Sequence, residues 1–277
     1  MLWNILITLA AAYAGLTSLL FLFQSRLVYY PEIGGREIRA TPEDVGLKYE
    51  SVSLVAADGV TLHSWFVPAR QPRGTVLLLH GNAGNISHRL DWLQMFDRLG
   101  YSTLIIDYRG YGKSGGEPSE QGTYLDAEAA WRHLVETRKI PQRRIVLVGE
   151  SIGGAIAAWL AARHPPGALV IASGFTSVPD LGAKLYPFLP VRLLARIRYD
   201  TRESLQSVTS PVFIAHSRDD EIVPFEHGLA LYAAAKEPKQ FLELSGGHNE
   251  GFIFMRESWV GALGDFLDQH LNREERS

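Results

Sequence analysis

The sequence predicts an α/β fold in which a mostly parallel central sheet is covered by helices on both faces. Three observations predict it: short runs of apolar, β-branched residues recur along the chain, helical patterns lie between them, and a turn signal joins the first two runs as a hairpin. Strands that are apolar on both faces are typical of parallel sheets, because helices cover both sides. With 277 residues, 46% of them hydrophobic, the chain can form one large domain after an apolar N-terminus.

Residues 2–25 form an apolar segment without a charged side chain. As a helix they would reach roughly 36 Å, enough to cross the hydrocarbon core of a bilayer. Arg26 ends the segment, and the aromatic residues Trp3, Tyr29 and Tyr30 lie where interfacial side chains are expected. We therefore expect a single-pass membrane anchor.

A cleaved secretory signal is the alternative, because residues 12–14, Ala-Tyr-Ala, offer a small-x-small cleavage site. The lack of Lys and Arg before the apolar segment, and its continuation to Phe23, favour an uncleaved anchor. We expect residues 1–30 to comprise the anchor and juxtamembrane segment, and residues 31–277 the folded domain. Because the first arginines follow the segment, the positive-inside tendency favours a cytoplasmic domain, although it leaves the side of the membrane open.

The folded domain starts with a linker, residues 31–44, that is rich in Gly, Pro and charge. Asp58-Gly59 is a hairpin turn signal between the first two strands, Gly100 closes the first helix, and the second helix ends before Pro141. The expected strands are residues 48–56, 60–67, 76–79, 103–106, 145–148, 169–172, 212–215 and 240–244. The expected helices are residues 86–99, 119–139, a segment that starts directly after Ser151, 226–235 and 258–271.

Residues 145–153, Ile-Val-Leu-Val-Gly-Glu-Ser-Ile-Gly, lead from a β-branched strand directly into an Ala-rich helix. This is the Gly-x-Ser-x-Gly pattern, in which a sharp strand-to-helix turn exposes a serine hydroxyl. Gly149 and Gly153 leave room for the turn, and the helix N-terminus directs N–H groups toward Ser151. We therefore expect Ser151 to be the nucleophile of a serine hydrolase rather than an ordinary turn serine.

The same five-residue pattern occurs again at residues 112–116, Gly-Lys-Ser-Gly-Gly. Glu117 and Pro118 follow it, so no helix begins from Ser114, and we expect a surface loop here. Nor is this a phosphate-binding loop, because Asp107 occupies the position that requires the first glycine.

An acid and a histidine follow Ser151 at the ends of two later strands. Asp220 comes shortly after the strand 212–215, and His248 shortly after the strand 240–244. The ligand site of an open parallel sheet lies beyond the carboxyl ends of its strands, and the chain order Ser, Asp, His fits a nucleophile elbow. We expect His248 to accept the serine proton and Asp220 to orient the imidazole.

Other residues compete for these two roles. Asp219 is the main alternative to Asp220, and Glu221 is a weaker one. Among the other histidines, His216 and His227 flank the acid loop, whereas structural or solvated positions are expected for His63, His133, His164 and His270.

The strand 76–79 runs into residues 80–85, His-Gly-Asn-Ala-Gly-Asn, a glycine-rich loop that can expose backbone N–H groups. We expect an oxyanion hole made by the N–H of Asn82 and the N–H of Ile152, which directly follows the nucleophile. His80 is expected to brace this loop rather than to carry protons.

These motifs resemble the α/β-hydrolase superfamily over a span from Lys48 to the C-terminus. The resemblance is carried by the elbow, by residues 80–85, by residues 107–114 (Asp-Tyr-Arg-Gly-Tyr-Gly-Lys-Ser), by Asp220 before Ile-Val-Pro and by His248 after Gly-Gly. The resemblance implies that Asp220, not Asp219, is the acid. Many relatives have glycine where this chain has Ser217, a departure that we expect to leave the triad untouched.

The apolar N-terminus followed by residues 24–31, Gln-Ser-Arg-Leu-Val-Tyr-Tyr-Pro, resembles a narrower subfamily of membrane-anchored hydrolases. Relatives in that group include protein depalmitoylases and lipid-acting esterases. The interval 175–210 is longer than a plain crossover needs, and residues 185–191 are apolar but interrupted by prolines. A long crossover with small helices or a lid explains it. We expect a lid whose substrate-facing residues are Leu185, Tyr186, Phe188 and Leu189.

We therefore expect an acyl hydrolase that cleaves carboxylic esters or thioesters of acyl chains, including lipids, through an acyl-enzyme on Ser151. A serine peptidase or amidase with the same triad is one alternative, and a non-catalytic binding module is another. No metal or organic cofactor is expected. The net charge of −3 gives no indication of a nucleic-acid partner, and the absence of cysteine removes disulfides and thiol catalysis. The oligomeric state stays open.

Overall fold

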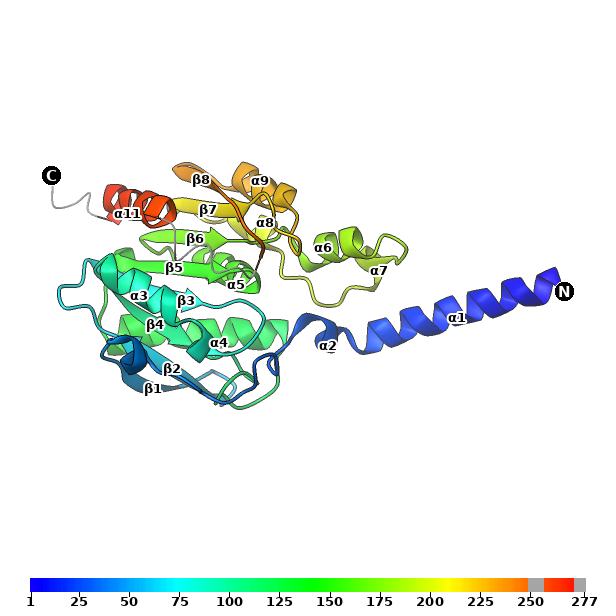
Figure 1. Ribbon diagram of the computed structural model, residues 1–277, viewed down its shortest axis with the longest axis horizontal. Helices are drawn as coiled ribbons and strands as arrows, with labels where there is room; N and C mark the ends of the chain where they lie inside the picture. Colours follow the sequence, from blue (N-terminus) through cyan, green and yellow to red (C-terminus); the bar gives the residue numbers. More distant parts are fainter. Residues whose placement is uncertain (249–256, 272–277) are drawn as a thin grey trace.

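The structure, a computed structural model, describes residues 1–248 and 257–271, and within these residues eight strands form one sheet (Figure 1). The strand order is β1-β2-β4-β3-β5-β6-β7-β8. Strand β2 pairs antiparallel with β1 and β4, and all other neighbours are parallel. The bounds are β1 Glu50–Val55, β2 Thr61–Val67, β3 Gly74–Leu79, β4 Tyr101–Ile106, β5 Ile145–Glu150, β6 Ala168–Ala172, β7 Val212–Ser217 and β8 Lys239–Leu244.

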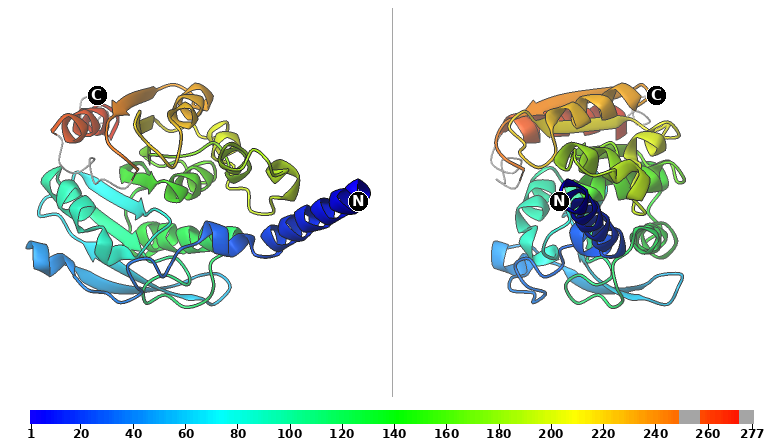
Figure 2. Two further views of the ribbon diagram at one scale, coloured as in Figure 1. Left: turned by 45° about the vertical axis from the view of Figure 1, so that its right-hand side comes forward. Right: turned by 90° about the vertical axis from the view of Figure 1, so that its right-hand side faces the viewer.

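Helices cover both faces of this sheet (Figure 2). Successive side chains of the central strands enter opposite cores: in β3, Val76 packs on the face covered by α3 and α11, whereas Leu77 packs on the face covered by α4, α5, α8 and α9. This confirms the predicted parallel α/β class. The α-helices are α1 Leu2–Leu22, α2 Gln24–Val28, α3 Leu90–Arg98, α4 Glu120–Arg132, α5 Ile152–Ala161, α6 Val178–Leu185, α7 Val191–Leu194, α8 Thr201–Leu205, α9 Phe225–Ala234 and α11 Glu257–Leu271.

Two predicted helices are too long. The helix expected at 86–99 begins at Leu90, because the Asn85 side chain accepts a hydrogen bond from the Ser87 N–H and closes a separate 3₁₀ turn, Ile86–His88. The helix expected at 119–139 ends as an α-helix at Arg132 and continues as a π turn, His133–Thr137. Ser119 caps its start by accepting the N–H of Gly122.

Helix α1 extends away from the sheet and carries the chain's N-terminus at its far end (Figure 1). It is 21 residues long, it contains no charged side chain, and no side chain in it is buried. By length and composition it is a candidate transmembrane anchor.

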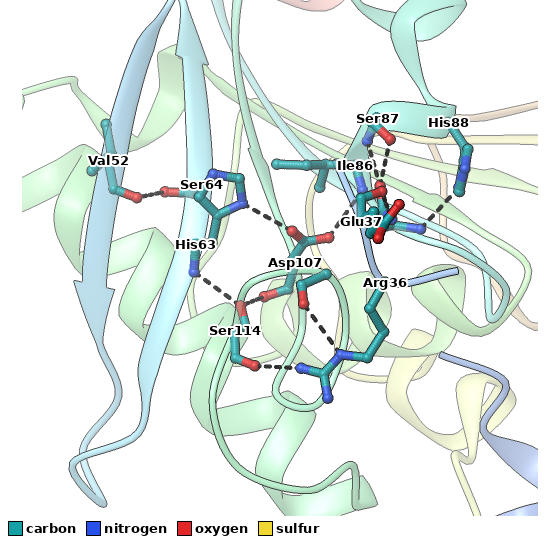
Figure 3. Close-up of polar contacts among 12 residues, drawn as sticks. Arg36, Glu37, Val52, His63, Ser64, Ile86, Ser87, His88, Asp107 and Ser114 are labelled. Atoms are coloured by element: carbon teal, nitrogen blue, oxygen red, sulfur yellow. Dashed lines mark hydrogen bonds and ion pairs between the residues drawn. The ribbon is translucent and has the colours of Figure 1, made fainter. Parts of the chain in front are cut away.

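Within the predicted linker, residues 35–37 lie against the loops that follow β3 and β4 (Figure 3). The Arg36 guanidinium donates to the carbonyls of Gly112 and Ser114, and the Asn85 side-chain amide donates to the carbonyls of Gly35 and Glu37. The segment after α2 is therefore fixed to the domain by several hydrogen bonds.

Residues 112–116 form a loop from which no helix begins, and Lys113, Gly115 and Gly116 are exposed, as predicted. Ser114 itself is buried, with 1% of its surface exposed. Its Oγ donates to the Asp107 carbonyl and accepts the backbone N–H of His63 (Figure 3). The Asp107 carboxylate bonds the His63 ring and also accepts the Ile86 N–H. These bonds join β2 to the loops that follow β3 and β4.

The long interval between β6 and β7 holds α6, α7 and α8. Helix α8 packs against α5 and α9, with Leu205 buried, and Tyr199 and Val208 are buried beside it. The exposed apolar part is narrower than the interval 175–210: it centres on α6, α7 and their connection, where Leu185, Tyr186 and Phe188 are largely exposed. A lid can therefore be formed only by this narrower part.

Candidate active site

Ser151 lies at the turn between β5 and α5 with φ 53° and ψ −116°. A non-glycine residue with positive φ is uncommon and strained, and such positions gather at functional sites. The turn is held by the Ser151 N–H, which donates to the Ala172 carbonyl at 2.9 Å. A Cβ on Gly149 would overlap the backbone of Gly153, and one on Gly153 would overlap the Leu79 carbonyl. Both glycines of the motif are therefore required by close backbone contacts.

The structure brings Ser151, His248 and Asp220 together in one chain of hydrogen bonds. The His248 Nε2 lies 3.2 Å from the Ser151 Oγ, and its Nδ1 lies 2.8 Å from the Asp220 Oδ2. With the proton on Nδ1, the ring donates to Asp220 and its Nε2 accepts from the serine hydroxyl. This arrangement suits an imidazole that removes the serine proton.

The Asp220 carboxylate is fully buried and its two oxygens have separate partners. While Oδ2 faces His248, Oδ1 accepts the backbone N–H of Ile222 at 3.0 Å and of Val223 at 2.7 Å. Burial alone raises the pKa of a carboxyl group, but the hydrogen bonds from His248 and Val223 outweigh it and hold the pKa of Asp220 below its ordinary value. The group is therefore ionised at neutral pH.

The two acids that were alternatives to Asp220 accept hydrogen bonds from the backbone of the loop that carries His248. Asp219 accepts the N–H of Gly246 at 3.3 Å, and Glu221 accepts the N–H of His248 at 3.0 Å. His216 is buried, and its Nε2 lies 2.8 Å from the Val223 carbonyl. Burial lowers the pKa of His216, so this ring is neutral beside the Asp220 carboxylate, 3.6 Å away.

Ser217 has a structural role that the sequence did not indicate. Its Oγ donates to the Gly246 carbonyl at 2.5 Å and accepts the Asp219 N–H at 3.1 Å. The hydroxyl thus ties the acid loop to the loop that carries His248. The expectation that the change from glycine leaves the triad untouched misses this contact. The sequence signal for this contact is a serine two positions before Asp219, because a serine hydroxyl can accept the backbone N–H two residues later.

The glycine-rich loop after β3 is held by polar side chains that its sequence did not reveal. Glu150, the variable residue of the elbow motif, accepts the Gly81 N–H at 3.3 Å and bonds the Arg89 Nε at 3.1 Å. Arg89 in turn donates to the Ala83 carbonyl at 3.0 Å. The loop is therefore tied to the elbow itself, and Asn82, Ile152 and Ser151 line the same cavity.

His80 is fully buried between Tyr108 and Tyr111. Its Nδ1 lies 2.7 Å from the Gly81 carbonyl, so the ring braces the loop by local contacts. Burial, which penalises the charged imidazolium, lowers the pKa of His80 to about 4.

This buried histidine is expected to make the free energy of unfolding depend on pH. Between pH 6.5 and about 4 the unfolded chain binds a proton at His80 that the folded chain does not, so stability falls as the pH decreases through this window. The loss attributable to His80 is about 3 kcal/mol over the window. Urea unfolding at several pH values measures it. In His80→Phe, which does not titrate, the slope should be shallower; equal slopes would contradict the assignment.

A cavity of about 520 Å³ opens beside Ser151. All four predicted lid residues, Leu185, Tyr186, Phe188 and Leu189, line it. Ile222 and Val223 line it from the acid loop, and none of the lining residues within 1–248 and 257–271 carries a charged side chain. Such a cavity suits an apolar group held next to the serine. Within residues 1–248 and 257–271, no cluster of three His, Cys, Asp or Glu side chains has the arrangement of a metal site.

Comparisons with known proteins point to one family. The sequence profile of the alpha/beta hydrolase fold matches residues 74–192. The chain is 37% identical to the alpha/beta hydrolase domain-containing protein WAV2 of Arabidopsis thaliana, covering 91% of this chain and 90% of that protein. It is 31% identical to the uncharacterized membrane protein YNL320W of Saccharomyces cerevisiae, covering 96% of this chain and 98% of that protein.

Among solved structures, the esterase Pf2001 of Pyrococcus furiosus superposes with a TM-score of 0.72 at 24% identity, covering 88% of this chain and 100% of that one. This likeness shows a shared fold. The sheet order, the elbow, the family profile and the full-length relatives agree, and the yeast membrane protein fits an N-terminally anchored group. The chain belongs to the α/β-hydrolase family, and within it resembles the members that carry an N-terminal membrane anchor.

Proposed function

We propose that this hydrolase is a membrane-anchored serine esterase or thioesterase that cleaves acyl chains through an acyl-enzyme on Ser151. The observation that carries the proposal is the hydrogen-bonded chain Ser151–His248–Asp220 beside a cavity whose described lining residues are mostly apolar. Helix α1 supports the membrane attachment, because it is long and apolar enough to span a bilayer. The esterase with the same fold is consistent with ester chemistry.

In the first half of the reaction, His248 takes the hydroxyl proton as the Ser151 Oγ attacks the carbonyl carbon of the acyl group. The negative charge that develops on the carbonyl oxygen is stabilised by the N–H groups of Asn82 and Ile152. The C–O or C–S bond then breaks, and the alcohol or thiol leaves with the proton from His248. Asp220 stabilises the imidazolium in between and stays ionised.

In the second half, a water molecule takes the place of the leaving group. His248 removes one proton from the water, the resulting oxygen attacks the acyl-enzyme carbonyl, and the same N–H groups stabilise the second oxyanion. Breakdown releases the fatty acid and returns the proton to the Ser151 Oγ. Every step uses groups that the protein itself supplies.

A peptidase or amidase could use the same three side chains, but the lining of the cavity favours an acyl substrate. Apolar side chains gain about 25 cal/mol for each Å² of apolar surface that they remove from water, which favours an acyl chain over a solvated peptide. A non-catalytic role is less consistent with the geometry, because the strained φ of Ser151 costs stability without aiding binding.

Labelling with a fluorophosphonate probe tests the nucleophile and the reaction class. The wild-type protein in detergent should be labelled, mass spectrometry should place the label on Ser151, and Ser151→Ala should not be labelled while keeping the wild-type melting temperature. Purified wild type should also hydrolyse p-nitrophenyl esters or acyl-CoA thioesters. Labelling of Ser114, or cleavage of peptides with no turnover of either acyl substrate, would contradict the proposal.

A further inference from the structure

The wall of the cavity opposite the lid is formed by the anchor. Leu16, Leu20 and Phe21 of α1 and Leu27 and Val28 of α2 line the same cavity as Ser151. The lid helices α6 and α7 lie beside the C-terminal part of α1 in both Figure 1 and the left view of Figure 2. The segment expected only to attach the protein therefore borders the reaction site.

The lining residues lie on one face of α1. Leu16 and Leu20 are four positions apart, and Tyr13 precedes Leu16 by three, so the three side chains follow one another along the helix. From this face of the helix, the Tyr13 hydroxyl donates a hydrogen bond to the Phe188 carbonyl of the lid at 2.9 Å. Leu22 lies on the opposite face, is 63% exposed and does not line the cavity.

Polar contacts fix the end of the anchor to the lid backbone. The Gln24 side-chain amide donates to the Leu194 carbonyl at 2.7 Å and accepts the Arg196 N–H at 2.8 Å. Arg196 also donates to the Phe21 carbonyl at 2.9 Å, and its guanidinium lies 4.7 Å from the centre of the Phe21 ring. A cation at a helix C-terminus is favourable, because the last carbonyls lack partners within the helix.

The chain after α2 fixes the anchor to the catalytic domain as well. The Tyr29 hydroxyl lies 3.0 Å from the Tyr199 hydroxyl in the buried core, and Tyr30 forms a parallel β-bridge with Ala83 in the glycine-rich loop. The Arg36 contacts in Figure 3 continue this attachment. Residues 16–28 therefore hold a defined position over the site instead of acting as a flexible tether.

The chemistry of this wall identifies what it binds. The residues of α1 that continue away from the cavity are mostly apolar and are exposed, as is expected of a surface that faces lipid tails. An acyl chain that moves along α1 from the bilayer to Ser151 stays on apolar surface throughout, and each methylene kept from water is worth about 0.8 kcal/mol. A short-chain substrate gains none of this, because it does not reach the anchor wall.

We propose that the anchor is a part of the substrate site: Leu16, Leu20, Phe21, Leu27 and Val28 form one wall of the acyl-binding cavity, and long acyl chains reach Ser151 from the bilayer along this wall. The inference rests on the proposed function and deepens it. It assigns the selection of acyl-chain length to the membrane helix as well as to the lid.

The test uses the full-length protein in detergent micelles and two substrates that differ only in chain length, p-nitrophenyl butyrate and p-nitrophenyl palmitate. Leu20→Trp fills the cavity at the anchor wall and should reduce kcat/KM for palmitate about tenfold more than for butyrate, since removing room for methylenes in an apolar pocket has effects of this size. Leu22→Trp, on the opposite face of the same helix, should leave the ratio of the two kcat/KM values at the wild-type value.

Two results would overturn the inference. One is a palmitate-to-butyrate ratio of kcat/KM that is unchanged in Leu20→Trp. The other is an equal change of this ratio in Leu20→Trp and Leu22→Trp, because that result indicates an effect on insertion into the micelle. If Leu20→Trp is not labelled by a fluorophosphonate, Leu16→Trp gives the same readout. Failure of the proposed function is distinguishable, because the wild-type protein would then hydrolyse neither ester.

Discussion

Asp220→Asn is expected to lower kcat about 10⁴-fold with little change in KM. The asparagine amide cannot accept the Nδ1–H of His248 as a carboxylate does, and it favours the tautomer whose Nε2 cannot take the Ser151 proton. The two backbone N–H bonds to Oδ1 can persist, so the loop should keep its shape. Steady-state hydrolysis of p-nitrophenyl butyrate measures the loss, with the melting temperature as a check on folding.

The neighbouring acid supplies the matched control. Asp219 is exposed, and its carboxylate touches the backbone of Gly246 instead of the ring of His248. We expect Asp219→Asn to lower kcat by less than about tenfold, because an amide oxygen still accepts the Gly246 N–H. A loss at Asp219 that equals or exceeds the loss at Asp220 would show that the acid has been assigned to the wrong residue.

Gly153→Ala is expected to cause a large loss of stability. The added Cβ would overlap the carbonyl of Leu79 and lie 2.7 Å from the carbonyl of His80, and both are backbone atoms that cannot rotate away. Strain of this kind destabilises by about 3 kcal/mol or more. Urea unfolding followed by circular dichroism gives the change in the free energy of unfolding.

Gly261→Ala is the control for this effect, because Gly261 lies in α11 and a Cβ there meets nothing within 4 Å. Alanine has the higher helix propensity, so this substitution should stabilise the protein by about 0.5–1 kcal/mol. If the backbone contact decides the outcome, alanine lowers the free energy of unfolding at Gly153 and raises it at Gly261. A loss at Gly153 no greater than about 0.5 kcal/mol would mean that the elbow relaxes easily.

The sequence predicted the α/β class because two-sided apolar strands and amphipathic helices leave periodic patterns. The ends of elements were predicted less accurately. The apolar pattern started a helix at residue 86, but the Asn85 side chain caps a separate 3₁₀ turn there and α3 begins only at Leu90. The burial of Ser114 depends on its hydrogen-bond partners in β2 and after β4. The side chains of Asp220 and His248 lie where the pattern of strand ends placed them, and their catalytic roles stay predictions.

What the sequence by itself determined is local: the strand-turn-helix around Ser151, the alternation of strands with helices, and an apolar N-terminal helix. Each of these follows from steric and burial demands within a few successive residues. Only the tertiary structure decided that Gln24 contacts Leu194, 170 positions later, and that α1, α6 and α7 line the same cavity. Contacts of this kind depend on strand order and on how two exposed apolar segments pack, and no short pattern encodes either.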